Sequence, residues 1–345
     1  MKVLFIGGTG FISEACTKLA VARGLDVTVL NRSNRQAIEG SRSIVADISD
    51  AGAAAGALRG KTWDAVVDFI AFTPADVEAH TALVRASAGQ YVFMSSASAY
   101  RKPTAFGLIG ETTALANPLW QYSRDKIACE ELLNRAHREA GFPATIVRPS
   151  LTYGETIIPL AVNSWQRSYT AVDRMRRGLP VIVPGDGLTL WTITHNTDFA
   201  KGLVGLLGNP GAIGQAFNIM SDEAPTWNEI YRMTAEAAGV PAPRLVHIAS
   251  DFIMACLPEM TGTLAGDKSN TALFDCSKVR RLVPDFTATT RFREGIRRTI
   301  DWFDAEPSRR LIDSEAASAW DRLLSAYDRG LQSAVGDFAG APQRQ

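Results

Sequence analysis

A tyrosine and a lysine are spaced so that they share one face of a helix. Tyr122 and Lys126 stand four residues apart in the segment YSRDK. An ammonium group beside a phenol favours the tyrosinate and lowers a pKa that starts at about 10. Upstream, Met94-Ser95-Ser96-Ala97 ends an apolar run, and a serine hydroxyl there would hold a substrate hydroxyl or carbonyl beside Tyr122. The pattern predicts proton exchange with a substrate.

A glycine-rich segment near the start of the chain predicts a cofactor site. GGTGFIS, residues 7–13, follows the apolar run 3–6 and opens a helix-like stretch that stops at Gly24. Glycines let the backbone turn sharply and approach a pyrophosphate, whose charge is met by backbone N–H groups and the positive end of the helix dipole. This strand–turn–helix context favours a dinucleotide over the alternative, a plain tight turn. Ser13 occupies the third small position.

The end of the second predicted strand bears on the choice between NAD and NADP. NAD binders usually carry a carboxylate there, roughly 20 residues after the glycines, whereas this chain has Leu30-Asn31-Arg32. With no carboxylate to repel a 2′-phosphate, and with Arg32 and Arg35 close by, NADP is favoured over NAD. The alternative is that both arginines are solvated loop charges. Asp47 is either an acceptor for the adenine amino group or a helix cap.

We assign a wider set of residues to the cofactor site, drawn from the glycine turn and from the ends of the predicted strands. The set is Gly7, Gly8, Thr9, Gly10, Phe11, Ile12, Asn31, Arg32, Arg35, Asp47, Ile48, Ile70, Ala71, Phe72 and Pro149.

The elements that must position these residues follow from the apolar pattern. Short apolar runs alternate with helix-compatible segments at 3–6, 27–30, 43–46, 65–70, 90–94 and 144–147. Such alternation predicts an α/β fold, a Rossmann-type doubly wound parallel sheet covered on both faces. We expect a dinucleotide-binding domain over 1–150. A smaller α/β substrate lobe follows over 151–335, and some of its elements return to the first domain. Substrate would bind in the crevice between them.

Four motifs together resemble the extended short-chain dehydrogenase/reductase superfamily, in the branch of nucleotide-sugar epimerases and dehydratases. They are GGTGFIS at 7–13, SSASAY at 95–100, YSRDK at 122–126 and RPSLTYG at 148–154, with further likeness in GLPVIVPGDG and LWTITHNTDFA. The resemblance implies proton transfer by Tyr122, pKa lowering by Lys126, and hydride exchange with a nicotinamide. In the family's SSxxxY pattern the serine four before the tyrosine positions the substrate hydroxyl, which selects Ser96 over Ser95. A homodimer is the superfamily's usual arrangement.

Two departures from the family pattern narrow the expected chemistry. The stretch 67–72, VDFIAF, replaces a His-Leu-Ala-Ala type sequence near the cofactor. Ala97 and Ser98 stand where dehydratases have acidic residues, which disfavours elimination of water. The remaining enzymatic alternatives are an NAD(P)-dependent epimerase of a sugar or nucleotide sugar, which we favour, and a net NADP-dependent reductase or dehydrogenase of a small carbonyl or hydroxyl compound. A non-catalytic dinucleotide-bound regulator or RNA-binding protein is the alternative from another class.

Composition excludes several other classes. The 345 residues include 36 basic and 36 acidic side chains, so no net charge recruits nucleic acid or an acidic membrane. The four cysteines are far apart and lack zinc spacing, so no metal is expected. No signal-peptide pattern opens the chain and no apolar run reaches about 18 residues, so we expect a cytoplasmic protein with reduced thiols.

A few further residues have two interpretations each. Trp165 and Trp191 would either stack on a sugar or base or pack in the core. Tyr153 could line the nicotinamide end of the cleft, and the sequence does not favour either outcome. A basic run would either contact a substrate phosphate or form a solvated helix face, which is the commoner case; it comprises Arg167, Arg174, Arg176 and Arg177.

Overall fold

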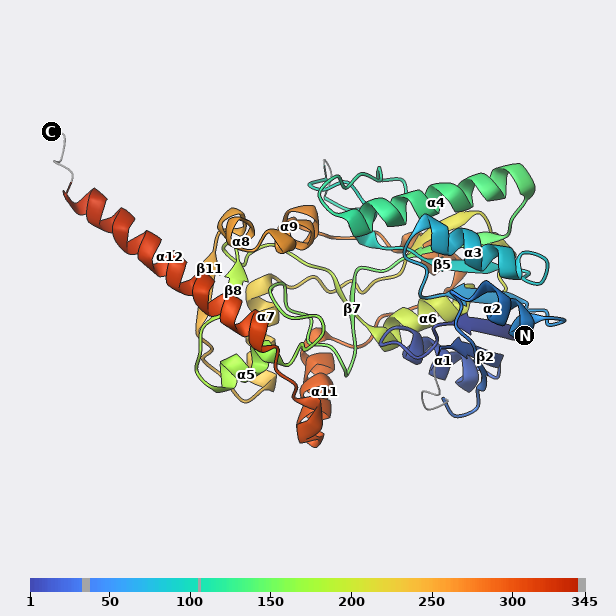
Figure 1. Ribbon diagram of the computed structural model, residues 1–345, viewed down its shortest axis with the longest axis horizontal. Coiled ribbons are helices and arrows are strands. Elements are labelled where there is room, and N and C mark those ends of the chain that lie inside the picture. Colours follow the sequence, from blue (N-terminus) through green and yellow to red (C-terminus); the bar gives the residue numbers. More distant parts are fainter. Residues whose placement is uncertain (33–37, 105–106, 341–345) are drawn as a thin grey trace.

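A parallel sheet forms the centre of the larger half of the molecule (Figure 1). The computed structural model describes residues 1–32, 38–104 and 107–340. Within them the main sheet has seven strands in the order β10-β6-β5-β4-β1-β2-β3, and every pairing is parallel. The strands are β1 (Lys2–Ile6), β2 (Asp26–Asn31), β3 (Arg42–Val45), β4 (Ala65–Asp68), β5 (Tyr91–Met94), β6 (Ala144–Arg148) and β10 (Gln215–Asn218). The predicted Rossmann-type fold is confirmed.

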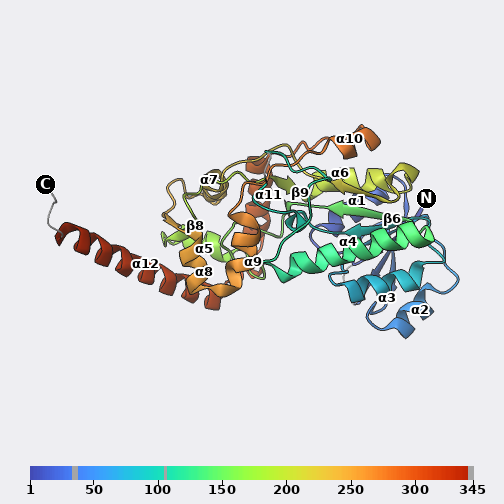
Figure 2. The ribbon, with the colours of Figure 1, turned by 90° about the horizontal axis from the view of Figure 1, so that it is seen from above.

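Helices cover both faces of this sheet (Figure 2). On one face lie α1 (Ser13–Ala22) and α6 (Asn196–Leu206); on the other lie α2 (Ala51–Leu58), α3 (Pro74–Val84) and α4 (Gln121–Ala140). The central strand shows why two layers of helices are needed. Val3 and Phe5 pack into the core beneath α1 and α6, whereas Leu4 and Ile6 pack into the core beneath α2 to α4. A strand that is apolar on both sides must be covered on both sides.

The order of the strands creates a site for a ligand. From β1 the chain adds β2 and β3 on one side, and then returns to add β4 and β5 on the other. Ligands of open α/β sheets bind at such a switch point, outside the carboxyl ends of the strands. Here those ends are the glycine turn after β1 and the loop after β4.

The second half of the chain forms a separate group of small elements and also returns to the main sheet through β10. Its own pairs are β7 (Leu151–Tyr153) with β9 (Ile193–His195), and β8 (Val181–Pro184) with β11 (Leu245–Ile248). Its helices are α5 (Thr170–Arg176), α7 (Trp227–Ala237), α8 (Ser250–Cys256), α9 (Thr261–Thr263), α10 (Ser277–Leu282), α11 (Phe292–Ala305) and α12 (Ser314–Gly340). Helix α12 projects away from the body in both views (Figures 1 and 2).

Short helical turns complete the chain. The 3-10 turns are η1 (Ala97–Ala99), η2 (Pro210–Ala212), η3 (Pro258–Met260) and η5 (Pro307–Arg309), and η4 (Leu264–Lys268) is a π-helical turn. None of the helices in the described parts of the chain is long and apolar enough to cross a bilayer. Within those same parts, no cluster of three His, Cys, Asp or Glu side chains could hold a metal ion.

Candidate active site

The turn between β1 and α1 requires glycine. Gly7 has a φ of +79°, a conformation that L side chains rarely adopt. A Cβ atom on Gly7 would lie 2.4 Å from Cγ2 of Ile70, and one on Gly8 would lie 2.8 Å from Cγ1 of Val29. Ser13, at the third small position, stabilises the turn, because its hydroxyl donates to the Gly7 carbonyl at 2.6 Å. Glycine is therefore required here by the backbone conformation of Gly7 and by close packing against Ile70 and Val29.

The start of α1 fits the pyrophosphate of a dinucleotide. Ile12 caps the helix without a side-chain hydrogen bond. The backbone N–H groups of Phe11 and Ile12 have no hydrogen-bond acceptor among the described residues. Unpaired N–H groups at the positive end of a helix dipole attract an anion. The backbone N–H groups of Phe11 and Ile12 thus fit the pyrophosphate of the dinucleotide that a Rossmann-type fold implies.

The residues assigned to the adenosine end lie apart from the pocket described next. Asn31 ends β2, and its Oδ1 accepts a hydrogen bond from Thr9 at 3.4 Å. Arg32 is exposed beside it, and Arg35 lies outside the described residues. Asp47 accepts hydrogen bonds from the backbone and hydroxyl of Ser49, which lower the pKa of the Asp47 carboxyl. Asp47 therefore stabilises a turn, and the N-cap of α2 is Asp50.

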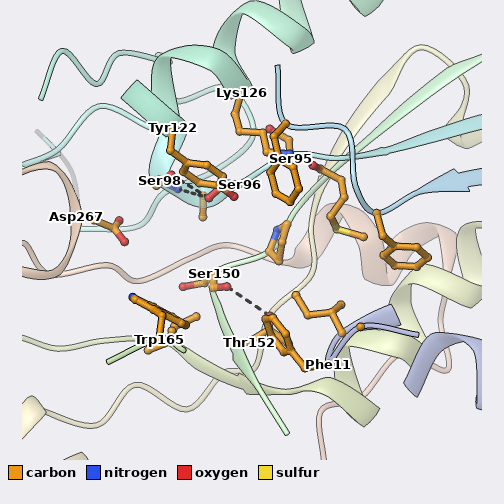
Figure 3. A pocket seen from close by; sticks show the side chains of 18 of the residues that line it. Phe11, Ser95, Ser96, Ser98, Tyr122, Lys126, Ser150, Thr152, Trp165 and Asp267 are labelled. Atoms are coloured by element: carbon orange, nitrogen blue, oxygen red, sulfur yellow. Dashed lines mark hydrogen bonds between the residues drawn. The ribbon is translucent and has the colours of Figure 1, made fainter. Parts of the chain in front are cut away.

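A cavity of about 550 Å³ lies at the carboxyl ends of the central strands. Of the residues assigned from the sequence, ten line it: Gly7, Gly10, Phe11, Ile12, Ile70, Phe72, Ser96, Tyr122, Lys126 and Pro149. Gly8, Thr9, Asn31, Arg32, Asp47, Ile48 and Ala71 do not. Tyr122, Ser96 and Ser98 lie on one side of the cavity, and Trp165 and Thr152 lie opposite (Figure 3).

Lys126 is held by two backbone carbonyls. Its ammonium donates to the Ala71 oxygen after β4 and to the Met94 oxygen at the end of β5, each at 2.7 Å. It lies 5.7 Å from the centroid of the Tyr122 ring. Burial lowers the pKa of Lys126 to about 8. The lysine thus ties together the ends of two strands beneath the tyrosine.

The expectation that Lys126 lowers the pKa of Tyr122 is wrong in this structure. Burial raises the pKa of the Tyr122 phenol, a hydrogen bond with Ser96 acts in the lowering direction, and the charge of Asp267 raises it further. The reason is that the lysine ammonium donates to the two carbonyls and not to the phenol. Burial therefore favours the protonated form of the Tyr122 phenol.

The two adjacent serines have different surroundings. The Ser95 hydroxyl donates to Glu130 at 2.5 Å, and that buried carboxylate also binds Arg148 at 2.5 Å. The Ser96 hydroxyl shares a hydrogen bond of 2.9 Å with Ser98 and faces the cavity beside Tyr122. Ser95 is thus part of an internal network, and Ser96 is placed to meet a substrate oxygen.

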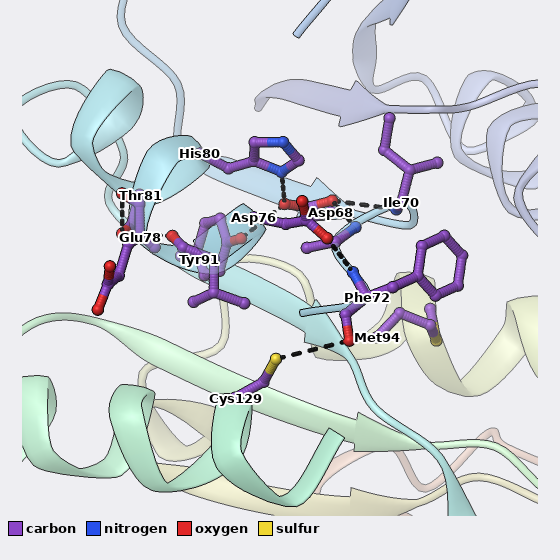
Figure 4. Close-up of polar contacts among 12 residues, drawn as sticks. Asp68, Ile70, Phe72, Asp76, Glu78, His80, Thr81, Tyr91, Met94 and Cys129 are labelled. Atoms are coloured by element: carbon purple, nitrogen blue, oxygen red, sulfur yellow. Dashed lines mark hydrogen bonds and ion pairs between the residues drawn. The ribbon is translucent and has the colours of Figure 1, made fainter. Parts of the chain in front are cut away.

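A buried carboxylate organises the loop after β4 (Figure 4). Oδ1 of Asp68 accepts from the backbone N–H groups of Ile70 and Ala71, each at 3.0 Å. Oδ2 lies 2.6 Å from Nδ1 of His80 and accepts from the Tyr91 hydroxyl at 2.7 Å. This network ends β4 at Asp68, two residues earlier than the predicted strand, and presents the Ala71 carbonyl to Lys126.

A family model, the NAD dependent epimerase/dehydratase family, matches residues 3–219. The chain belongs to this family. The match confirms the predicted superfamily and the class of NAD-dependent enzyme.

The proteins to which this family member is similar include a stem-loop binding protein, a reductase and a dehydratase. It is 27% identical over 262 residues to the chloroplast stem-loop binding protein of 41 kDa b from Arabidopsis thaliana, covering 71% of this chain and 65% of that one, just under two thirds. It is 27% identical to the 2'-dehydrokanamycin reductase of Streptomyces kanamyceticus, covering 83% of this chain and 80% of that one. The dTDP-glucose 4,6-dehydratase of Bacillus anthracis str. Ames, solved in complex with NAD, superposes with a TM-score of 0.70 at 18% identity, covering 89% and 98% of the two chains.

The second half of this family member contributes cavity residues that sequence reasoning left open or missed. Stacking and core packing were both open for Trp165 and Trp191. Both line the cavity, but Trp191 is buried in the core against Trp227, whereas Trp165 is half exposed. Asp267 and Lys268 also line it, on the π-helical turn η4, and nothing in the sequence singled them out. Trp120, directly before α4, was missed as well.

Other candidates lie elsewhere. Arg174 pairs with Asp321 at 2.6 Å and Arg176 with Asp304 at 2.6 Å, and none of the four arginines of the basic run lines the cavity. Tyr153 does not line it either, because its ring is fully buried beside His195.

Proposed function

We propose that this protein transfers a hydride between NAD(P) and a carbon of a sugar or nucleotide sugar that carries a hydroxyl, in the cytoplasm. The observation that carries the proposal is one cavity that holds Ser96, Tyr122 and Lys126 and that the glycine turn also enters. When bound, the nicotinamide supplies the hydride donor or acceptor.

The chain's own residues would divide the remaining work. The glycine turn and the start of α1 bind the pyrophosphate. Ser96 donates to the substrate oxygen, Tyr122 exchanges a proton with that oxygen, and Lys126 supplies positive charge beneath the phenol. Because the pKa of Tyr122 is raised, its neutral form is ready to protonate an alkoxide that forms as a carbonyl is reduced.

The cavity does not favour elimination of water. Among the described residues that line it, Asp267 is the only carboxylate, and Asp267 is paired with Lys102. Ala97 and Ser98 supply no second acid. Hydride chemistry without elimination is the better match.

A net reductase is the second candidate. The protonated Tyr122 suits reduction of a carbonyl, and the likeness to a 2'-dehydrokanamycin reductase extends over 83% of this chain. We also propose a preference for NADP, because Asn31 places no carboxylate at the end of β2 and Arg32 is exposed beside it.

The test is a comparison of wild type with Tyr122→Phe. Each protein is saturated with NAD⁺ or NADP⁺, or with the reduced forms, and given a panel of nucleotide sugars and oxo-sugars. Conversion with a change in the near-ultraviolet absorbance of the reduced nicotinamide identifies net redox; conversion without one identifies an epimerase. We expect Tyr122→Phe to lose about 10²–10⁴-fold in rate with unchanged cofactor affinity. Tyr153→Phe, outside the cavity, is the matched control. Equal rates for Tyr122→Phe and wild type would refute the proposal.

A further inference from the structure

A buried lysine without a counter-ion lies at the substrate end of the cavity. Lys268 is 2% exposed and lines the cavity, next in the chain to Asp267. Asp267 lies away from Phe11 in the cavity (Figure 3). The Lys268 ammonium makes no hydrogen bond and no ion pair with any residue that the structure describes. It lies 5.8 Å from the centroid of the Trp120 ring and 5.4 Å from that of Trp165.

The protein alone does not offset the cost of burying this charge. Burying an unpaired ammonium costs more free energy than cation–π contacts with two indole rings return. Burial lowers the pKa of Lys268, the charge of Asp267 opposes this, and that of Lys102 adds to it. An anion delivered by a ligand would compensate the charge and add a charge-assisted hydrogen bond.

The charges of Lys102, Asp267 and Lys268 indicate which kind of anion would bind. Asp267 is already paired with Lys102, so the three side chains together leave one positive charge uncompensated, that of Lys268. A carboxylate carries one negative charge and balances it. A phosphate ester carries about 1.5–2 negative charges near neutral pH and would be left partly unpaired between two indole rings.

The lysine is held at a fixed place relative to the reacting end. The indole N–H of Trp227 donates to the Lys268 carbonyl at 3.0 Å. The side-chain amide of Asn117 donates to the carbonyls of both Gly266 and Ser98, each at 2.8 Å. The π-helical turn that carries Lys268 is thus tied to the segment that follows Ser96, and π-helical turns often occur at functional sites.

The Trp120 ring lies next to both Lys268 and Tyr122. The Trp120 ring, which Lys268 faces, lies 5.0 Å from the ring of Tyr122, centroid to centroid. The Trp120 indole therefore neighbours both the Lys268 ammonium and the Tyr122 ring.

We propose that Lys268 binds a carboxylate of the substrate, so that the substrate is a sugar acid or a similar polyol acid that carries its carboxylate close to the reacting carbon. The inference rests on the proposed function only for which end of the cavity reacts. Trp120 and Trp165 form the apolar sides of the carboxylate site, and the Lys268 ammonium is its charged donor.

Calorimetric titration of the NADP⁺-saturated full chain tests this with three probes that share a ring: D-glucuronate, D-glucose 6-phosphate and D-glucose. One charge-assisted hydrogen bond predicts that glucuronate binds roughly 10- to 100-fold tighter than glucose. Lys268→Met should abolish that difference. Lys278→Met removes a lysine outside the cavity and should keep it.

Folding is monitored by the Tm of each variant. Replacing an unpaired buried charge with an apolar side chain should leave the Tm of Lys268→Met unchanged or raised. Any one of three results overturns the proposal. Wild type could fail to prefer glucuronate over glucose, Lys268→Met could keep that preference, or glucose 6-phosphate could bind tighter than glucuronate. Tyr122→Phe should keep the preference even though it loses hydride transfer, so failure of the proposed function is visible separately.

Discussion

Replacing Asp68 with alanine should destabilise the protein and loosen the cofactor site together. The carboxylate is completely buried and accepts from two backbone N–H groups, from Tyr91 and from His80. Asp68→Ala leaves these donors unpaired in the interior. Removing one partner from a buried charged network costs about 3–5 kcal/mol, or a decrease in Tm of roughly 5–10 °C for a chain of this size.

The variant Asp68→Asn removes the carboxylate charge but keeps the hydrogen bonds that hold the loop after β4. Its side-chain oxygen still accepts from the N–H groups of Ile70 and Ala71, so the loop after β4 and the Ala71 carbonyl on Lys126 should stay in place. We expect a loss of only about 1 kcal/mol and nearly unchanged cofactor affinity, in contrast to Asp68→Ala.

The pH dependence of the same variants provides a second measurement. Burial acts to lower the pKa of His80, but the hydrogen bond and charge of Asp68 outweigh it, so the pKa is raised. A histidine with a raised pKa in the folded state contributes stability that is complete below its unfolded pKa of about 6.5 and is lost as pH rises through the folded value. The advantage of wild type over Asp68→Asn should therefore be complete below about pH 6.5 and shrink as the pH rises above it.

Thermal and urea unfolding followed by circular dichroism measures these stabilities, and titration with NADP⁺ measures the site. The reasoning is refuted if Asp68→Ala unfolds within about 1 kcal/mol of wild type, or if Asp68→Asn is as damaging as Asp68→Ala.

Three further predictions concern the glycine turn, Lys126 and the buried pair of Glu130 and Arg148. Gly7→Ala and Gly24→Ala both place a side chain at positive φ, which should cost each variant about 1 kcal/mol. Only the Gly7→Ala side chain meets a neighbour, at 2.4 Å, so Gly7→Ala should lose more stability than Gly24→Ala and should alone lose dinucleotide affinity in titrations. The rate of hydride transfer should fall as pH rises through about 8, where Lys126 loses its proton, and a flat pH–rate profile would contradict this. Glu130→Gln leaves a buried guanidinium without its counter-charge and should cost about 3–5 kcal/mol in urea unfolding, whereas Glu131→Gln, exposed one residue on, should cost almost nothing.

Local patterns predicted the parts of the molecule that depend on neighbours in sequence. The glycine turn follows directly from β1, and Tyr122 and Lys126 share a helix because of their spacing. Six of the seven strands of the main sheet were predicted because a sheet covered on both faces requires continuous apolar runs, whereas β10 was not predicted. These features need no knowledge of which distant segments meet.

The rest of the site depends on contacts that join distant segments. Asp267 lines the cavity and pairs with Lys102, which is 165 residues away in the chain, so this part of the site has no local signature. His80 had no evident partner in sequence because its partner, Asp68, comes from the preceding strand. The raised pKa of Tyr122 depends on burial, which residue spacing does not report.

The glycine at position 262 links the two walls of the cavity. A Cβ atom there would lie 2.4 Å from Cδ1 of Trp120, whose ring packs against Tyr122. Any larger residue at this position would displace the indole that packs against Tyr122. Directed evolution toward new substrates should therefore randomise positions 120 and 262 as a pair, because single changes at position 262 would be selected against for their effect on turnover before their effect on specificity could be seen.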